Sequence, residues 1–275
     1  MLIRIGHRPN PDDAFMFWAL GAGEVDTRGL EFESSAECIE TLNLWARESR
    51  LEVTALSVNA YPFVQNDYVL LPHGASMGSG FGPVVVSHEP LARERLREVE
   101  IAVPSATTTS FLVLRMYLGG GFRYRVAPGA EILEQVKSGR AEAGLITEES
   151  LLTYRDKGLA KSIDLGEWWL LETGLPLPLT VNVARRDLGP RLDDVSAVIR
   201  DSIVAGLRSR RRAMAHALRF GRSSDASITD RFVGMYVNAR SFDFDDEGRE
   251  AIRELLRRAQ AIGAFERPVK IEFAA

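Results

Sequence analysis

The 275-residue sequence contains one cysteine, Cys38, and four histidines. A single cysteine cannot form an internal disulfide, and it also excludes a cysteine-rich zinc site. The histidines show no metal-ligand spacing with one another. The net charge of −4 gives no electrostatic reason to bind nucleic acid or an anionic membrane surface. These shortages argue against a disulfide-stabilised protein, a cysteine-rich zinc protein and a protein that binds nucleic acid or an anionic membrane.

Long apolar runs are also missing. No stretch approaches the roughly 18 apolar residues that span a bilayer. No basic segment followed by an apolar one precedes the first strand, so no signal peptide is predicted. The motifs of P-loops, nucleophile elbows and dinucleotide-binding loops are absent as well. We therefore expect a cytoplasmic protein that does not bind a membrane. Its activity should not use a P-loop, a nucleophile elbow or a dinucleotide-binding loop.

The sequence does contain short apolar strands alternating with helical segments. Its 45% hydrophobic and 26% charged residues are ordinary for a globular protein. Strands are predicted at residues 2–6, 53–56, 84–87, 101–103 and 143–146. The first and fourth of these strands each lead through a loop into a helix. This alternation predicts an α/β fold.

The arrangement along the chain predicts two lobes. Prolines stop any helix in the run 175–183, and its β-branched end predicts a strand, so this run passes between lobes. From residue 193 onward the sequence is mostly helical. We expect a discontinuous first lobe formed by residues 1–90 and 182–275, and a second lobe formed by residues 91–181.

Four consecutive hydroxyl residues, 107–110, lie between the strand at 101–103 and the following helix. Hydroxyls beside the free N–H groups of a helix N-terminus favour a carboxylate or phosphate. Simple capping of the helix by one threonine is the alternative. The pattern thus indicates a candidate site for a small anion.

Three further segments are candidates for the site. Ser57 and Asn59 follow a strand and share a face, where ligands of open α/β sheets bind, although a polar strand end is the alternative. The glycine-rich segment 73–83 lets backbone approach a ligand or serves only as a flexible connection. Glu148 and Glu149 follow the strand at 143–146, where a carboxylate can act as a general base or merely begin a solvated helix.

Across nearly the whole chain the sequence resembles the 1,4-dihydroxy-6-naphthoate synthases of the futalosine pathway of menaquinone biosynthesis. Each matching segment is short, and their order and spacing make the resemblance specific. The segments are Pro11-Asp12-Asp13-Ala14-Phe15-Met16-Phe17, Glu40-Thr41-Leu42-Asn43, His73-Gly74-Ala75-Ser76-Met77-Gly78, Glu142-Ala143-Gly144-Leu145-Ile146, Asp164-Leu165-Gly166-Glu167-Trp168-Trp169, Thr173-Gly174-Leu175-Pro176-Leu177-Pro178-Leu179, Ala184-Arg185-Arg186-Asp187-Leu188-Gly189 and Tyr236-Val237-Asn238-Ala239.

The resemblance implies a two-lobed periplasmic-binding-protein-like fold of type II, which the element layout also suggests, with the ligand cleft between the lobes. It implies a carbon–carbon lyase that acts on cyclic dehypoxanthinylfutalosine, a small anionic substrate, without a metal or an organic cofactor. Substrate contacts are implied at Ser57, Val58 and Asn59 in one lobe, and at Thr108, Thr109 and Ser110 in the other.

One position departs from the pattern of these synthases. Their catalytic histidine, which accepts a proton, aligns with Glu148. The ordinary pKa of glutamate is about 4.3 against about 6.5 for histidine, and burial can raise it. Three alternatives remain open: a lyase with Glu148 as its base, a related lyase for another cyclic carboxylate, and a non-catalytic small-carboxylate binder. His7, in the first loop, is an alternative base.

Overall fold

The structure, a computed structural model, describes residues 1–274. Its elements follow one another in an alternating order that agrees with the predicted α/β class. In chain order they are β1 (Leu2–His7), α1 (Pro11–Gly21), β2 (Glu31–Ala36), α2 (Ile39–Arg47), β3 (Val53–Ser57), the 3-10 helix η1 (Val58–Phe63), β4 (Tyr68–Leu70), β5 (Ser76–Gly78), β6 (Val84–Ser87), α3 (Arg93–Glu98), β7 (Glu100–Val103), α4 (Thr109–Leu118), β8 (Arg123–Val126), α5 (Gly129–Lys137), β9 (Ala143–Ile146), α6 (Ser150–Thr153), η2 (Arg155–Lys157), β10 (Ala160–Asp164), α7 (Leu165–Thr173), β11 (Leu177–Arg185), η3 (Arg186–Arg191), α8 (Leu192–Arg208), α9 (Arg210–Ala217), η4 (Leu218–Phe220), α10 (Ala226–Tyr236), α11 (Ala239–Phe242) and α12 (Asp246–Ala261).

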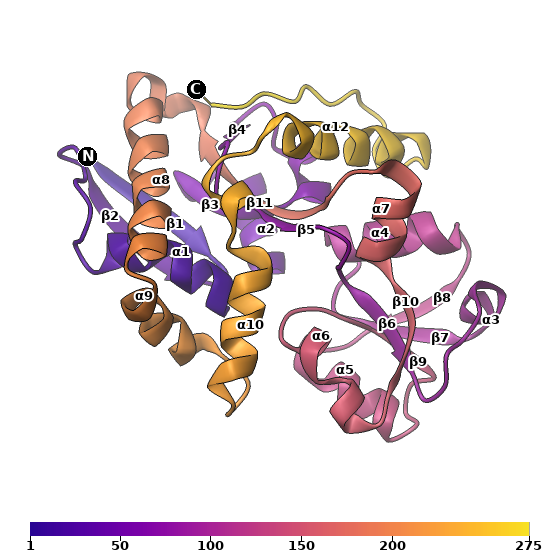
Figure 1. Cartoon of the computed structure of the whole chain (residues 1–275). Helices are drawn as coiled ribbons and strands as arrows, with labels where there is room; N and C mark the ends of the chain where they lie inside the picture. The colour runs from indigo at the N-terminus through magenta and orange to yellow at the C-terminus, as the bar shows by residue number, and fades with distance from the viewer. Residues whose placement is uncertain (275) are drawn as a thin grey trace.

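Two mixed sheets form the centres of two lobes, which lie side by side in Figure 1. The first sheet has the order β2-β1-β3-β11-β4, with β5 paired to β11, and the second has the order β10-β6-β9-β7-β8. Within each sheet, β1 and β7 run parallel to the neighbours that follow them through helical connections. The predicted two-lobed fold is therefore confirmed.

The chain crosses between the sheets twice. β5 belongs to the first sheet and β6 to the second, so the outward crossing lies within residues 79–83. The return lies between β10 and β11. The sequence placed these boundaries at 90/91, beyond the end of β6, and at 181/182, within β11. Periodicity shows that a strand exists, but the sheet to which it belongs depends on its partners.

The glycines of the outward crossing are required by close packing rather than by flexibility. A Cβ on Gly82 would lie 2.8 Å from the backbone nitrogen of Gly166 at the start of α7. A Cβ on Gly78 would collide with the carbonyl oxygen of Phe81. The crossing therefore packs directly against the beginning of α7, which joins the two lobes on this side.

The largest apolar cluster extends across both lobes on the side of α4, α7, β11 and α12. Trp169 is fully buried in it and donates a hydrogen bond to the carbonyl oxygen of Pro176 at 3.1 Å. A second cluster joins α1, α8 and strands β1, β3, β11 and β4 of the first sheet, and a third lies under α5 in the second lobe. The shared core holds the lobes together along one side and leaves the opposite side to the cleft.

The C-terminal helices return to the first lobe, as expected. The first part of the helical region predicted from residue 193 onward is interrupted at Ser209, which separates α8 from α9. The arginines beyond this break lie on the surface, where Arg210 pairs with Asp230 and Arg212 with Glu24. α10 follows along the inner side of the first lobe and faces α6 of the second lobe (Figure 1). No helix among residues 1–274 is both long and apolar enough to span a bilayer.

Candidate functional site

A cavity of about 340 Å³ lies between the two lobes. The loop between β1 and α1, the end of β3 and helix α10 line it from the first lobe. The start of α4 and the turn after β9 line it from the second. Its walls are formed by Arg8, Pro9, Asn10, Asp12, Cys38, Ile39, Glu40, Ser57, Ser76, Pro83, Pro104, Thr108, Thr109, Ser110, Pro128, Gly129, Thr147, Glu148, Ser150, Leu151, Leu179, Thr180, Arg222, Phe232 and Tyr236.

The N-terminus of α4 forms one wall of this cavity. The side chain of Thr108 caps the helix by accepting a long hydrogen bond, 3.5 Å, from the Phe111 nitrogen. Thr109 Oγ1 donates to the carbonyl oxygen of Leu179 at 2.8 Å, so its hydroxyl holds α4 against β11. Ser110 also lines the cavity. The first N–H groups of a helix lack intrahelical partners, and here they adjoin the cavity together with the positive end of the helix dipole.

The three substrate contacts predicted around the end of β3, Ser57, Val58 and Asn59, lie in three different environments. Ser57 lines the cavity and exchanges two hydrogen bonds with Asn43, at 3.0 and 3.1 Å. The side chain of Val58 is fully buried in the shared apolar core and does not line the cavity. Asn59 lines a separate hollow, where its amide donates to the carbonyl oxygen of Thr107 at 3.1 Å. The 3-10 turn that begins at Val58 breaks the two-residue alternation expected of a strand.

Glu148 lies in the turn after β9 and faces the cavity. Its backbone φ is +57°, a left-handed conformation that costs a non-glycine residue about 1–2 kcal/mol. The carboxylate pairs with Arg222 of the first lobe at 3.0 Å, and about 30% of the side chain remains exposed. Strain of this kind persists only where the surrounding structure imposes it, and such residues cluster at functional sites.

The surroundings of Glu148 act on its pKa in opposite directions. Burial raises the pKa of Glu148 above its ordinary value, while the guanidinium groups of Arg222 and Arg8 oppose the rise. The carboxylate is therefore more basic than an exposed glutamate, and the two cations limit the rise of its pKa. These are the properties of a general base.

The neighbouring Glu149 has a structural task instead. It is buried, and its carboxylate accepts hydrogen bonds from the Arg222 nitrogen, at 2.5 Å, and from the hydroxyl of Thr229. Since Glu149 belongs to the second lobe and both partners to the first, these bonds join the lobes across the cavity. The sequence placed the two glutamates together, and the structure gives them different neighbours.

His7 does not line the cavity. Its ring stacks on Phe17 with centroids 5.3 Å apart, and its Nδ1 lies 2.9 Å from the carbonyl oxygen of Arg8. The imidazole therefore packs beside α1, outside the set of residues that contact the cavity. This position gives no support to His7 as an alternative base.

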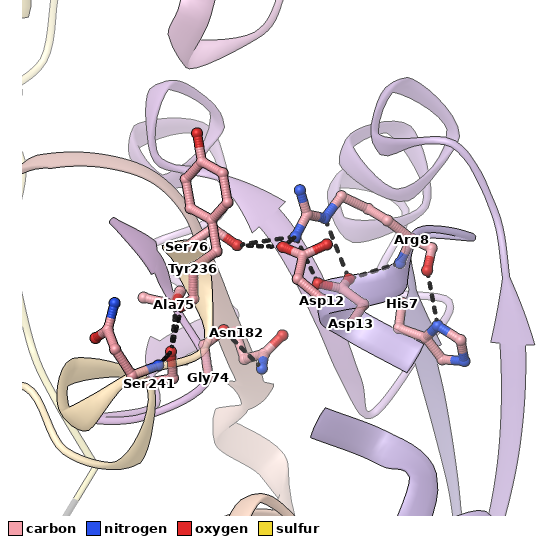
Figure 2. Close-up of polar contacts among 11 residues, drawn as sticks. His7, Arg8, Asp12, Asp13, Gly74, Ala75, Ser76, Asn182, Tyr236 and Ser241 are labelled. Carbon is pink, nitrogen blue, oxygen red and sulfur yellow. Dashed lines mark hydrogen bonds and ion pairs between the residues drawn. The ribbon is translucent and has the colours of Figure 1, made fainter. Parts of the chain in front are cut away.

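Arg8 is the centre of a buried charged network that the sequence analysis missed (Figure 2). Its guanidinium donates to Asp12 at 2.8 Å, to Asp13 at 2.5 Å and to Ser76 at 2.9 Å. Ser76 in turn donates to Asp12 at 2.9 Å. The available signal was the position of this loop after the first strand, the same signal used for the residues after β3.

Tyr236 of α10 also lines the cavity, beside this network (Figure 2). Burial is the main reason that the pKa of Tyr236 is raised, so its hydroxyl stays protonated and can donate a hydrogen bond. The ring of Phe81 meets that of Tyr236 edge to face at 5.4 Å. Within residues 1–274, no three His, Cys, Asp or Glu side chains are grouped as metal ligands would be. The site consists of hydrogen-bonding groups and carboxylates.

The fold and the cavity define a two-lobed α/β protein with a small-ligand site between its lobes. Solved structures share this fold at low sequence identity. The alkanesulfonate-binding protein of Xanthomonas axonopodis pv. citri, bound to MOPS, is 11% identical with a TM-score of 0.75, over 99% of this chain and 98% of its own. The periplasmic aliphatic sulphonate binding protein of Escherichia coli is 12% identical with a TM-score of 0.66, over 98% and 95%. The architecture is therefore that of the type II periplasmic binding proteins.

This chain belongs to the menaquinone biosynthesis family, which matches residues 3–261. The 1,4-dihydroxy-6-naphthoate synthase of Thermus thermophilus is 41% identical over 268 residues, 95% of each chain. The synthase of the same name from Streptomyces coelicolor is 36% identical over 267 residues, 95% of this chain and 94% of its own. A crystal structure from Archaeoglobus fulgidus is 37% identical with a TM-score of 0.91, over 96% of this chain and 98% of its own. The resemblance found in the sequence is thus confirmed.

Proposed function

We propose that this chain is a 1,4-dihydroxy-6-naphthoate synthase in which Glu148 is the proton acceptor. Membership of the family and full-length similarity to two synthases of this name support the lyase activity. The observation that carries the assignment of Glu148 is its geometry. A carboxylate is held by a left-handed backbone at the wall of the inter-lobe cavity and paired with Arg222.

The substrate of this reaction is cyclic dehypoxanthinylfutalosine, the small anionic molecule implied by the resemblance. Its carboxylate would bind at the N-terminus of α4, where free N–H groups and the side chains of Thr108 and Ser110 meet the cavity. Ser57 would contact it from the first lobe. The main chain of Val58 and Asn59 remains part of the proposal only as a support for this wall, because neither residue lines the cavity.

In the proposed reaction the base accepts a proton from the substrate, and the electron pair left behind drives cleavage of a carbon–carbon bond. The aromatic naphthoate forms, and the rest of the substrate leaves as a second product. Burial makes Glu148 more basic than an exposed glutamate, and its pairing with Arg222 favours the ionised form. Closure of the lobes, held by the bonds of Glu149 to the first lobe, would exclude water from the cavity. Both the burial of Glu148 and its pairing with Arg222 would then act more strongly. The proposal retains the cytoplasmic location expected from the sequence, because a biosynthetic lyase meets its substrate inside the cell.

The test is turnover of cyclic dehypoxanthinylfutalosine by the purified protein, with chromatographic detection of 1,4-dihydroxy-6-naphthoate. The wild type is compared with Glu148→Gln and with Glu142→Gln, a matched control that changes an exposed glutamate of the same lobe. Product from the wild type and the control, but not from Glu148→Gln, supports the proposal. Ligand-dependent thermal stabilisation without any product would instead indicate a small-carboxylate binder or a lyase with another substrate.

A further inference from the structure

Asn10 occupies the N-cap position of α1 without capping the helix. Its carbonyl oxygen accepts the first helical hydrogen bond from the Ala14 nitrogen at 3.0 Å, but its side chain makes no capping bond. The residue is only 4% exposed and lines the cavity. Among residues 1–274, neither its Nδ2 nor its Oδ1 has a hydrogen-bond partner. Asparagine is favoured at this position because its side-chain oxygen normally accepts a hydrogen bond from a backbone N–H of the first turn, and that bond is missing here.

Asp12, two residues further on, has one free oxygen of the same kind. Its Oδ2 accepts hydrogen bonds from Arg8 and Ser76. Its Oδ1 is buried, and no group in the described part of the chain donates to it. Asp12 is 1% exposed and also lines the cavity. Arg8 thus fixes the carboxylate from one side and leaves the other oxygen without a donor.

Three buried, unsatisfied polar atoms on two residues that line the cavity require an explanation. More than about 90% of buried polar groups in proteins are hydrogen-bonded, and an unsatisfied one costs about 1–3 kcal/mol. Groups that satisfy these atoms must donate to the two oxygens and accept from the amide nitrogen of Asn10, which carries two N–H donors. Hydroxyls do both. A second carboxylate would be repelled by Asp12, and an ammonium could not accept from Asn10.

We propose that Asn10 and Asp12 form a subsite that binds hydroxyl groups of the ligand. In this subsite Asp12 Oδ1 accepts a hydrogen bond from one hydroxyl, and the amide of Asn10 both donates and accepts. Arg8 is the positioning residue, since it orients Asp12 by donating to Oδ2 and leaves Oδ1 free to accept from the ligand. The subsite rests on the proposed function, because the product named for the relatives carries hydroxyls and one carboxylate. It orients the hydroxylated ring toward the β1–α1 loop and the carboxylate toward α4.

The test compares two bicyclic acids by titration calorimetry under argon, which prevents oxidation of the hydroquinone. The probes are 1,4-dihydroxy-6-naphthoate and 2-naphthoate, which has the carboxylated ring system without hydroxyls. Wild-type protein should bind the dihydroxy acid about tenfold or more tightly than 2-naphthoate, the change expected for hydrogen bonds to a buried charged acceptor. This comparison needs no variant, so it is independent of folding defects.

Two variants and a control complete the test. Asn10→Leu and, separately, Asp12→Asn should reduce the ratio of the two affinities to below about threefold, with little change for 2-naphthoate. Asn66→Leu, at an exposed position, should leave the ratio unchanged. Equal wild-type affinities, or a ratio that survives both variants, would overturn the subsite while the lyase assignment stands. If neither acid binds and no turnover occurs, the proposed function fails and the subsite fails with it.

Discussion

Replacing Glu148 by glutamine removes the proposed base while preserving its size. General bases contribute about 100- to 10,000-fold to enzymatic rates, which corresponds to about 3–5 kcal/mol in the activation free energy. We expect kcat for Glu148→Gln to fall by about this factor. Substrate affinity should change little, because the anion is held at α4 on another wall of the cavity.

A second substitution at the same position separates the chemistry of the base from the shape of the site. Glu148→His introduces the residue that the resemblance places here, and a neutral imidazole accepts a proton as a carboxylate does. We therefore expect Glu148→His to keep most of the activity that Glu148→Gln loses. Its left-handed backbone suits histidine as well as glutamate, since histidine is enriched in that conformation.

The assay is single-turnover product formation followed across pH. In the wild type, the acid limb should lie above about pH 4.3, the ordinary pKa of glutamate, because burial raises the pKa of Glu148 and the base works only when ionised. Full activity of Glu148→Gln would refute the assignment. Equal losses for glutamine and histidine, with unchanged folding by circular dichroism, would show that the position matters for shape rather than for proton transfer.

Three further predictions concern other groups. Arg222→Gln removes a cation that lowers the pKa of Glu148, so the acid limb of the rate profile should move to higher pH; a limb that stays in place would contradict this. Thr108→Val should weaken binding of the naphthoate product by about 1–3 kcal/mol in calorimetry, and unchanged affinity would remove this hydroxyl from the site. Burial lowers the pKa of His73 from 6.5 to about 4, so only the unfolded state binds its proton between these pH values. Urea unfolding should therefore show up to about 3 kcal/mol lost from pH 6.5 to 4, relative to His73→Asn, and parallel curves for both proteins would refute this reasoning.

Several parts of the site followed from local pattern. The hydroxyls at the start of α4 were found because a helix N-terminus that follows a strand favours an anion, and the glutamates after β9 because they follow a buried strand. Asn10 and Asp12 also follow a strand, but Pro11 and the aspartates are equally suited to an ordinary helix start, so the pattern did not separate the two roles. The two roles are distinguished only in the folded chain, where the side chain of Asn10 makes no capping hydrogen bond and one oxygen of Asp12 has no donor.

Other features depend on segments far apart in the sequence. Arg222 was absent from the predicted site because it lies 74 residues beyond Glu148, in a loop with no motif of its own. Val58 was predicted as a contact by carrying over a segment, yet a 3-10 turn directs its side chain into the core. The boundaries between the lobes also depend on remote partners, since β6 lies between β10 and β9 in the second sheet and β11 lies between β3 and β4 in the first.

The amino-acid sequence by itself determined the α/β class, the two lobes, the family and the hydroxyl-rich start of α4. These rest on local periodicity, turn chemistry and the order of short segments, which the chain carries wherever its parts lie. The tertiary structure decided which glutamate faces the cavity, which cations set its pKa and which polar atoms stay free. Those properties arise from burial and from distances between remote residues, and both exist only after the two lobes have packed together.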